Sequence, residues 1–443
     1  MGKIRDFIAC RSADRGGGLR CGGETLELVI QGGTPLRGSI RIHGAKNSAL
    51  PILAATVLAD GRFELLDFPQ LSDVRTMLQI LEALGIRKLR HDKDVVLDTS
   101  TLSSAVVPES LMSQMRSSIF LMGPLLARFG EVTVSRPGGC AIGERRIDLH
   151  LDGLERMGAE IIQQNGRLVC RAPRLYGTTI YLDYPSVGAT ENLMMAATLA
   201  EGETVIHHAA KEPEIVDLAR FLNAMGAKIK GGGTDTIVIQ GVRKLHPTSY
   251  RVIPDRIVTG TMMLAGAMTN GELLLENVIP DHVRILIELL QQAGCHVEEG
   301  VNTLYVRGCG RPKAIKKVTT SPFPGFPTDL QAQMMAFLSI AEGVSIIKET
   351  VFDARFRHVN ELNRMGASIY VDLNTAFVRG VEQLTGAVVE ASDLRAGAAL
   401  VLAGLVAEGE TRVQHVHHID RGYESLEQSL RQLGANISRK TVE

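Results

Sequence analysis

The feature of the sequence that most constrains its fold is a two-part unit that occurs six times. One part is a segment rich in alanine, glycine and methionine that closes on a glycine, as in residues 53–61 and 195–202. The other part is an amphipathic segment that also ends on glycine and leads into a strand. The two parts alternate at a period of about 70 residues, so the repeat is a whole supersecondary unit rather than a short solenoid turn.

The amphipathic part predicts a helix followed by a hairpin. In the first unit Val74, Leu78, Leu81 and Leu84 recur at helical spacing, which places them on one buried stripe. A glycine then provides the left-handed residue that ends a helix. Such glycines stand at six positions: Gly85, Gly158, Gly226, Gly294, Gly366 and Gly434.

In the small-residue part, apolar side chains are spread around the whole helix, which predicts burial on most sides. Each unit should therefore read strand, helix, strand, helix, strand, strand. We expect an α/β protein with two groups of three units, in which the small-residue helices lie inside and the sheets outside. A single ring of six units is the alternative.

Composition limits the classes of function. A chain of 443 residues with 45% hydrophobic content is long enough for at least two domains. A net charge of -1 and the absence of tryptophan disfavour nucleic-acid binding, and no apolar run approaches the roughly 18 residues of a membrane span. Six cysteines occur without a Cys-x-x-Cys pair, so we expect a reducing cytoplasm and no metal site. Residues 1–24 read as a flexible N-terminal leader.

The segment 135–148 (SRPGGCAIGERRID) predicts a loop that carries a reactive thiol. Proline and paired glycines make a turn, so Cys140 should lie on a loop rather than in a core. Arg136, Arg145 and Arg146 lie nearby, and guanidinium groups lower the pKa of a cysteine thiol and favour the thiolate. The alternative is a surface turn with an incidental cysteine.

Positive charge gathers at the starts of corresponding helices. Lys46 opens the first small-residue helix, with Asn47 or Ser48 expected as its N-cap, and a lysine there completes an anion site. A solvated lysine beside a cap is the alternative. Cations and one carboxylate stand at related turns of later units: Arg116, Arg355, Arg395, Arg421 and Asp329. Such cations repel one another unless an anion binds, and guanidinium groups suit carboxylate and phosphate oxygens.

Taken together, these motifs resemble the enolpyruvyl transferase family, and within it the members that use UDP-N-acetylglucosamine. The resemblance runs from about residue 25 to the C-terminus. It is carried by residues 44–47 (GAKN), 115–118 (MRSS), 137–145 (PGGCAIGER), 186–190 (SVGAT), 326–333 (FPTDLQAQ), 393–395 (DLR) and 419–423 (IDRGY).

The resemblance implies a fold of two inside-out α/β barrels, each of three βαβαββ repeats. One domain would comprise residues 25–45 and 254–443, and the other residues 46–253, which carry the Cys140 loop. It also implies transfer of the enolpyruvyl group of phosphoenolpyruvate to the 3-hydroxyl of UDP-N-acetylglucosamine with release of phosphate, in peptidoglycan biosynthesis. These two small molecules would be its substrates, with no cofactor, no nucleic acid and no membrane as partner, and the resemblance leaves the oligomeric state open. The alternatives are a 5-enolpyruvylshikimate-3-phosphate synthase and a non-catalytic paralogue that binds the nucleotide sugar.

The resemblance further implies residue roles. Asp329 would be the general base, and Cys140 the acid that protonates the methylene carbon and the target of fosfomycin. Lys46 and Arg421 would join them in catalysis. The phosphoenolpyruvate site would comprise Lys46, Asn47, Arg145, Arg355, Arg395 and Arg421. The nucleotide-sugar site would comprise Arg116, Arg145, Arg146, Ile147, Asp148, Leu149, Ser186, Val187, Gly188, Asp329 and Val351. Arg146 is a departure, because the family usually has proline there.

Overall fold

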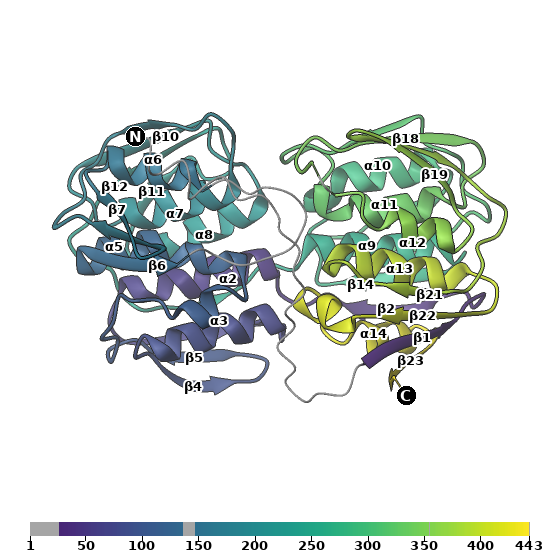
Figure 1. Ribbon diagram of the computed structural model, residues 1–443, viewed down its shortest axis with the longest axis horizontal. Coiled ribbons are helices and arrows are strands. Elements are labelled where there is room, and N and C mark those ends of the chain that lie inside the picture. Colours follow the sequence, from purple (N-terminus) through teal and green to yellow (C-terminus); the bar gives the residue numbers. More distant parts are fainter. Residues whose placement is uncertain (1–25, 136–146, 354, 443) are drawn as a thin grey trace. The chain divides into compact units, whose positions relative to one another are not determined.

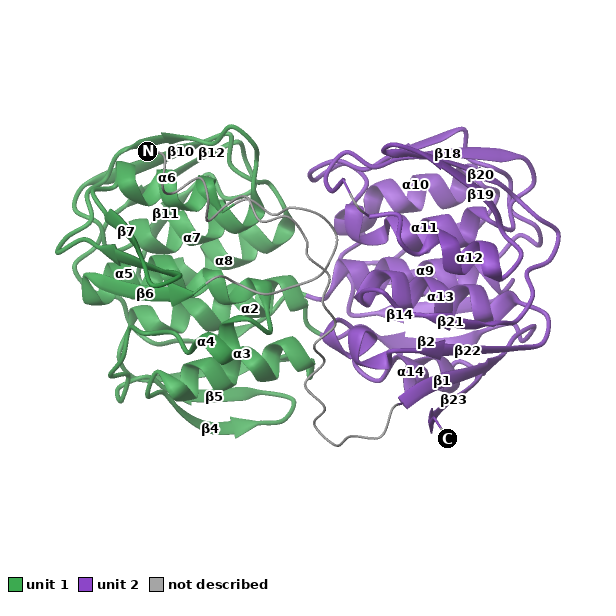
Figure 2. Cartoon of the chain, viewed as in Figure 1, with its two compact units in different colours: residues 1–18, 44–140, 145–253 green, residues 19–43, 141–144, 254–443 purple. Residues whose placement is uncertain are grey.

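The computed structural model describes residues 26–135, 147–353 and 355–442. Within these ranges the chain forms two compact units (Figure 1, Figure 2). The first unit contains residues 44–135 and 147–253, and the second contains residues 26–43, 254–353 and 355–442. Both units are mixed α/β structures.

The first unit contains three sheets, with strand orders β13-β3-β5-β4, β6-β8-β7 and β11-β12-β10-β9. Its helices and strands in chain order are α2 (Lys46–Ala55), η1 (Thr56–Leu58), β3 (Arg62–Leu66), α3 (Ser72–Ala83), β4 (Arg87–His91), β5 (Val95–Asp98), α4 (Glu109–Met112), η2 (Arg116–Leu121), α5 (Met122–Phe129), β6 (Glu131–Ser135), α6 (Asp148–Arg156), β7 (Glu160–Gln164), β8 (Arg167–Arg171), β9 (Thr179–Tyr181), α7 (Val187–Ala197), β10 (Glu203–His207), α8 (Pro213–Ala224), β11 (Lys228–Lys230), β12 (Thr236–Gln240) and β13 (Ser249–Arg251).

The second unit also contains three sheets, with strand orders β15-β16-β14-β2, β17-β18-β20-β19 and β21-β22-β1-β23. Its elements are β1 (Leu26–Gln31), β2 (Arg37–Arg41), α9 (Arg256–Met268), β14 (Glu272–Glu276), η3 (Pro280–Val283), α10 (Arg284–Gln292), β15 (His296–Glu299), β16 (Thr303–Arg307), β17 (Lys317–Thr319), η4 (Thr328–Leu330), α11 (Gln331–Leu338), β18 (Val344–Lys348), α12 (Val359–Arg364), β19 (Ser368–Asp372), β20 (Thr375–Arg379), β21 (Val388–Glu390), α13 (Leu394–Val406), β22 (Glu410–Gln414), η5 (Val416–Arg421), α14 (Leu426–Gln432) and β23 (Asn436–Thr441).

The fifth repeat shows the unit in full. Strand β17 pairs parallel with β18, β18 pairs antiparallel with β20, and β19 and β20 form the closing hairpin. The third repeat has the same order, from β9 to β12. In the second repeat the described residues show only an isolated bridge, between Val106 and Thr133, where a first strand is expected.

At each of two points where the chain passes from one unit to the other, the last strand before the crossing pairs within the unit that the chain is leaving. Strand β2 pairs parallel with β14 of the second unit, although it leads directly into α2 of the first. Strand β13 pairs parallel with β3 of the first unit and leads into α9 of the second.

The small-residue helices form the interiors of both units, as their composition predicts. In the second unit α9, α11 and α13 pack against one another (Figure 1). Every residue of α9 from Ile257 to Met268 is buried. Gly260 shows why small residues are needed, since a Cβ there would lie 2.5 Å from a methyl carbon of Leu330. Close packing of α9 therefore fixes the neighbouring turn η4.

The terminal glycines of the amphipathic helices have the predicted left-handed conformation. From Gly85 to Gly434 the six φ angles lie between 87° and 104°. The N-cap prediction for α2 was wrong, because the helix begins at Lys46 and its N-cap is Ala45, which makes no side-chain capping bond. Asn47 and Ser48 lie inside the first turn. Within the described part of the chain, no helix is both long and apolar enough to cross a bilayer.

Candidate active site

A carboxylate held by two buried arginines forms the centre of the candidate site in the second unit. Arg355 Nη2 donates to Asp329 Oδ1 at 2.7 Å, and Arg395 Nη2 donates to Asp329 Oδ2 at 3.0 Å. The residues Arg355 and Arg395 are 5% and 2% exposed, whereas the Asp329 side chain is 26% exposed. Three residues far apart in sequence therefore form one cluster whose carboxylate reaches solvent.

Local structure explains how Arg395 is fixed. Asp393 is the N-cap of α13 and accepts hydrogen bonds from the backbone N–H groups of Arg395 and Ala396, at 2.8 and 3.0 Å. Arg395 thus stands in the first turn, where the helix dipole disfavours a cation. The ring of Tyr423 lies beneath its guanidinium, with 5.6 Å between Cζ and the ring centroid.

The electrostatics of Arg395 favour an anion. Burial is the largest single influence on the pKa of Arg395 and lowers it, but Asp329, Tyr423 and Asp255 together raise that pKa above its ordinary value, so the group stays protonated. Its buried Nε and Nη1 atoms have no hydrogen-bond acceptor among the described residues. A buried cation with spare donors is suited to a second anion. The turn η5, which ends at Arg421, lies beside it: a Cβ on Gly422 would be 3.4 Å from Arg395 Nη1.

Sequence reasoning missed Glu349, which organises this cluster. Its carboxylate is buried and accepts bonds from Thr320 Oγ1 at 2.8 Å, the Val351 N–H at 2.8 Å and Thr328 Oγ1 at 2.9 Å. Thr328 Oγ1 in turn accepts a bond from Arg355 Nη1 at 2.9 Å. Glu349 therefore links η4, the turn that contains Asp329, to the segment that contains Val351 by hydrogen bonds. The one feature of the sequence that could have indicated Glu349 is its position, directly after a strand and two residues before Val351.

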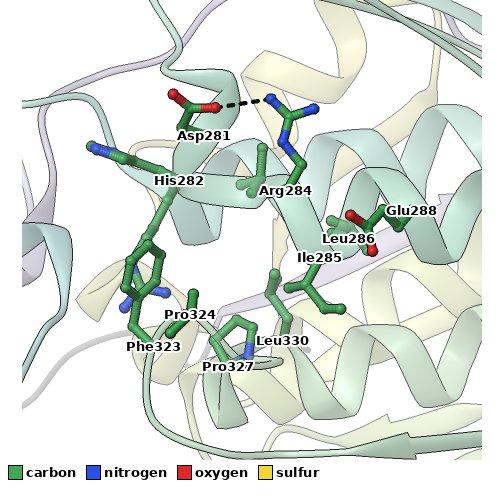
Figure 3. A pocket seen from close by; sticks show the side chains of 13 residues that line it. Asp281, His282, Arg284, Ile285, Leu286, Glu288, Phe323, Pro324, Pro327 and Leu330 are labelled. Atoms are coloured by element: carbon green, nitrogen blue, oxygen red, sulfur yellow. Dashed lines mark hydrogen bonds and ion pairs between the residues drawn. The ribbon is translucent and has the colours of Figure 1, made fainter.

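A cavity of about 230 Å³ adjoins the turn η4 (Figure 3). Pro327 and Leu330, on either side of Asp329 in sequence, line one wall, and residues of α10 line another. The guanidinium of Arg256 lies 5.8 Å from the ring centroid of Phe323, which also lines the cavity. No motif in the sequence indicated this cationic and aromatic wall.

In the first unit Lys46 begins α2, as expected, but it is buried and forms an ion pair. Lys46 Nζ lies 2.7 Å from Asp73 Oδ2, and the two side chains are 9% and 6% exposed. The solvated alternative for Lys46 is therefore wrong. Asp73, in the first turn of α3, was not identified from sequence because nothing in the spacing relates it to Lys46. Asn47 is partly exposed beside them on α2.

A second group in the first unit joins the starts of η2, α6 and α7. Ser186 is the N-cap of α7 and accepts a bond from the Ala189 N–H at 3.3 Å. A Cβ on Gly188 would lie 3.3 Å from His150 Cε1. Burial and then the charge of Arg116 lower the pKa of His150 to about 3, so its imidazole is neutral.

This second group contains most of the predicted nucleotide-sugar residues. Ile147, Asp148 and Leu149 lead into or begin the helix α6 that carries His150. His150 Nδ1 lies 3.0 Å from Asn192 Nδ2, a buried pair that sequence reasoning missed. Cys140, Arg145 and Arg146 lie outside the described residues.

A family model now adds to this geometry. The sequence model of the EPSP synthase (3-phosphoshikimate 1-carboxyvinyltransferase) family matches residues 30–430. The chain belongs to this enolpyruvyl transferase family. The resemblance inferred from the sequence motifs is thereby confirmed.

Relatives of this enolpyruvyl transferase are similar over nearly their whole length. A protein of Carboxydothermus hydrogenoformans named UDP-N-acetylglucosamine 1-carboxyvinyltransferase 2 is 56% identical over 415 residues, which are 93% of this chain and 99% of that protein. A UDP-N-acetylglucosamine 1-carboxyvinyltransferase of Halorhodospira halophila is 51% identical over 413 residues, with the same two coverages.

Solved structures show the enolpyruvyl transferase fold. The enolpyruvyl transferase NikO from Streptomyces tendae superposes with a TM-score of 0.85 at 27% identity, covering 95% of this chain and 100% of that one. An EPSP synthase from Acinetobacter baumannii superposes with a TM-score of 0.74 at 19% identity, covering 94% and 100%. The second likeness concerns the fold alone.

Proposed function

We propose that this protein transfers the enolpyruvyl group of phosphoenolpyruvate to the 3-hydroxyl of UDP-N-acetylglucosamine and releases phosphate. The observation that carries the proposal is the 56% identity, over 93% of the chain, with a UDP-N-acetylglucosamine 1-carboxyvinyltransferase. The protein would then act in peptidoglycan synthesis in the cytoplasm, with two small-molecule substrates and no cofactor.

The cluster around Asp329 supports the chemistry. Phosphoenolpyruvate carries a phosphate and a carboxylate, and both suit the buried guanidinium groups of Arg355 and Arg395. Without substrate, Asp329 supplies the negative charge between them. A substrate anion that takes over these arginines leaves the Asp329 carboxylate able to accept the proton of the sugar hydroxyl as its oxygen attacks C2.

The remaining roles complete the reaction. Cys140 donates a proton to the methylene carbon, which gives a tetrahedral intermediate with a methyl group, and loss of a methyl proton together with phosphate forms the enol ether of the product. Lys46, Arg145 and Arg421 stabilise the phosphate electrostatically, and Asn47 contributes to the same site.

We assign the nucleotide sugar to the group at the starts of η2, α6 and α7. Arg116 provides positive charge, and the N-terminus of α7, which Ser186 caps, offers the backbone N–H groups of Val187 and Gly188 to an anion such as the diphosphate. Residues 145–149, Asp329 and Val351 complete this proposed site.

We further propose that each unit is an inside-out α/β barrel domain of three βαβαββ repeats. The domains would comprise residues 25–45 with 254–443, and residues 46–253. The buried helices α9, α11 and α13 support this arrangement for the second unit, since they pack together while the sheets lie around them.

Parallel assays of phosphate release test the proposed function. The purified protein is given phosphoenolpyruvate with either UDP-N-acetylglucosamine or shikimate 3-phosphate. We expect phosphate release in the assay that contains UDP-N-acetylglucosamine and not in the one that contains shikimate 3-phosphate. Fosfomycin should stop this release. Release with shikimate 3-phosphate alone would assign the protein to the reaction named by the family model, and binding of the nucleotide sugar without release would indicate a non-catalytic paralogue.

A further inference from the structure

Two cysteines that have no place in the proposed reaction lie side by side in the second unit. Cys295 follows the glycine that ends α10, and Cys309 follows strand β16. Their Sγ atoms are 3.6 Å apart. Cys295 is buried, whereas Cys309 is exposed, so one thiol of the pair is open to reagents in solution.

The backbone on both sides of the pair is held by hydrogen bonds. The Cys295 N–H donates to the Leu290 carbonyl at 2.9 Å, in the turn that follows α10. Next to Cys309, the Gly308 N–H donates to the Gly271 carbonyl at 3.0 Å and the Gly310 N–H to Asn270 Oδ1 at 3.0 Å. The two Cα atoms are therefore fixed, and the approach of the sulfurs is a property of the fold.

A disulfide needs an S–S distance of about 2.05 Å, so the sulfurs must approach by roughly 1.5 Å. Rotation of the exposed Cys309 side chain can supply much of this movement without displacing the buried Cys295. Cys309 Sγ also lies 3.7 Å from the carbonyl of Ala293, two residues before Cys295 in the same turn. The side chain thus already points toward its partner.

We propose that Cys295 and Cys309 form a redox-responsive dithiol, which closes to a disulfide by exchange with a low-molecular-weight disulfide. The Cys309 thiolate attacks the small disulfide, forms a mixed disulfide and releases one small thiol. The Cys295 sulfur, after losing its proton to solvent, attacks Cys309 Sγ and releases the second small thiol. The two cysteines lose two electrons and two protons, and the small disulfide gains them.

Burial explains the order of these steps. Burial and then the neighbouring Cys309 raise the pKa of the Cys295 thiol to about 12, so Cys295 is a poor first nucleophile. The exposed Cys309 therefore reacts first. The second step should become faster as pH rises, because it requires the Cys295 thiolate.

The test uses the full-length protein in buffers of oxidised and reduced glutathione at several ratios, followed by mass spectrometry of its peptides without reduction. We expect a linked pair of peptides containing Cys295 and Cys309, lighter by two hydrogens than the two thiols and separated again by dithiothreitol. Cys170 is the internal control, since it is 0% exposed and burial raises the pKa of its thiol to about 12.

Two single variants separate the steps. Cys295→Ser should stop at a glutathione adduct on Cys309, and Cys309→Ser should leave Cys295 unmodified. Far-ultraviolet circular dichroism and thermal unfolding verify that both variants fold. A stable adduct on Cys309 of the wild-type protein with Cys295 still free would overturn the proposal, as would a link from Cys309 to any other cysteine. Enzyme activity does not enter the readout, so this result is independent of the proposed function.

Discussion

Replacing Asp329 by asparagine tests the claim that a carboxylate supplies the negative charge for two buried arginines. At an effective dielectric constant of about 20, each of the two contacts, at 2.7 and 3.0 Å, corresponds to roughly 6 kcal/mol of attraction before desolvation. Removing one partner of a buried ion pair typically costs about 3–5 kcal/mol. Asp329 is partly exposed and asparagine retains an acceptor, so we expect a loss of about 2 kcal/mol.

Such a loss should lower the midpoint of thermal unfolding by about 4–8 °C. The matched control is Asp281→Asn, because Asp281 pairs with Arg284 at 2.8 Å while its side chain is 85% exposed. Removal of that surface pair should cost less than about 1 kcal/mol.

Inorganic phosphate provides the second measurement. It should raise the unfolding midpoint of Asp329→Asn more than that of the wild-type protein, because the carboxylate no longer competes for Arg355 and Arg395. Equal losses in Asp329→Asn and Asp281→Asn, with no difference in the response to phosphate, would refute the reasoning.

Four further predictions concern single residues. Cys140→Ser should abolish or greatly slow phosphate release while the nucleotide sugar still binds in calorimetry; full activity would remove the thiol from the mechanism. Lys46→Met removes the ammonium group that pairs with the buried Asp73. It should lower the unfolding midpoint by several degrees and kcat/KM by at least tenfold. An unchanged midpoint would contradict a stabilising buried pair. Glu349→Gln should reduce kcat at least tenfold with a smaller change in the unfolding midpoint, because it misplaces the turn that carries the base; the reverse pattern would make Glu349 merely structural. Burial raises the pKa of Asp217 to about 6, so the folded state holds its proton more tightly and stability should fall by up to about 3 kcal/mol between pH 4 and 7. In urea unfolding, the stability of Asp217→Asn should fall less between pH 4 and 7 than that of the wild-type protein. If the two proteins showed the same dependence of stability on pH, Asp217 would not be the cause of the fall.

The repeat and its helices were predictable because they depend on local patterns. Apolar spacing such as that of Val74 and Leu78 selects a buried face, and a glycine at the helix end allows the positive φ found at Gly85. The same reasoning placed the N-cap of α2 two or three residues too late. Ala45 has the extended backbone conformation of an N-cap although its side chain cannot cap. The sequence favours Asn47 or Ser48 instead, because their side chains are able to cap a helix.

Pairing across long sequence distances was not predictable. The sequence of β2 does not indicate that it pairs with β14, some 230 residues later, because a strand's composition specifies burial and not a partner. The same holds within the site. Arg355, Arg395 and Asp329 were identified by their positions in related turns, but the partners Asp73 and Glu349 depend on tertiary contacts that no spacing encodes.

The most direct test of the proposed function is the identity of the product. The protein is incubated with phosphoenolpyruvate and UDP-N-acetylglucosamine, and the nucleotide sugar is analysed by mass spectrometry and proton NMR. The account predicts a sugar that carries one enolpyruvyl ether at its 3-hydroxyl, with one phosphate released for each product molecule. Unmodified nucleotide sugar, or an enolpyruvyl group at a different hydroxyl, would contradict it.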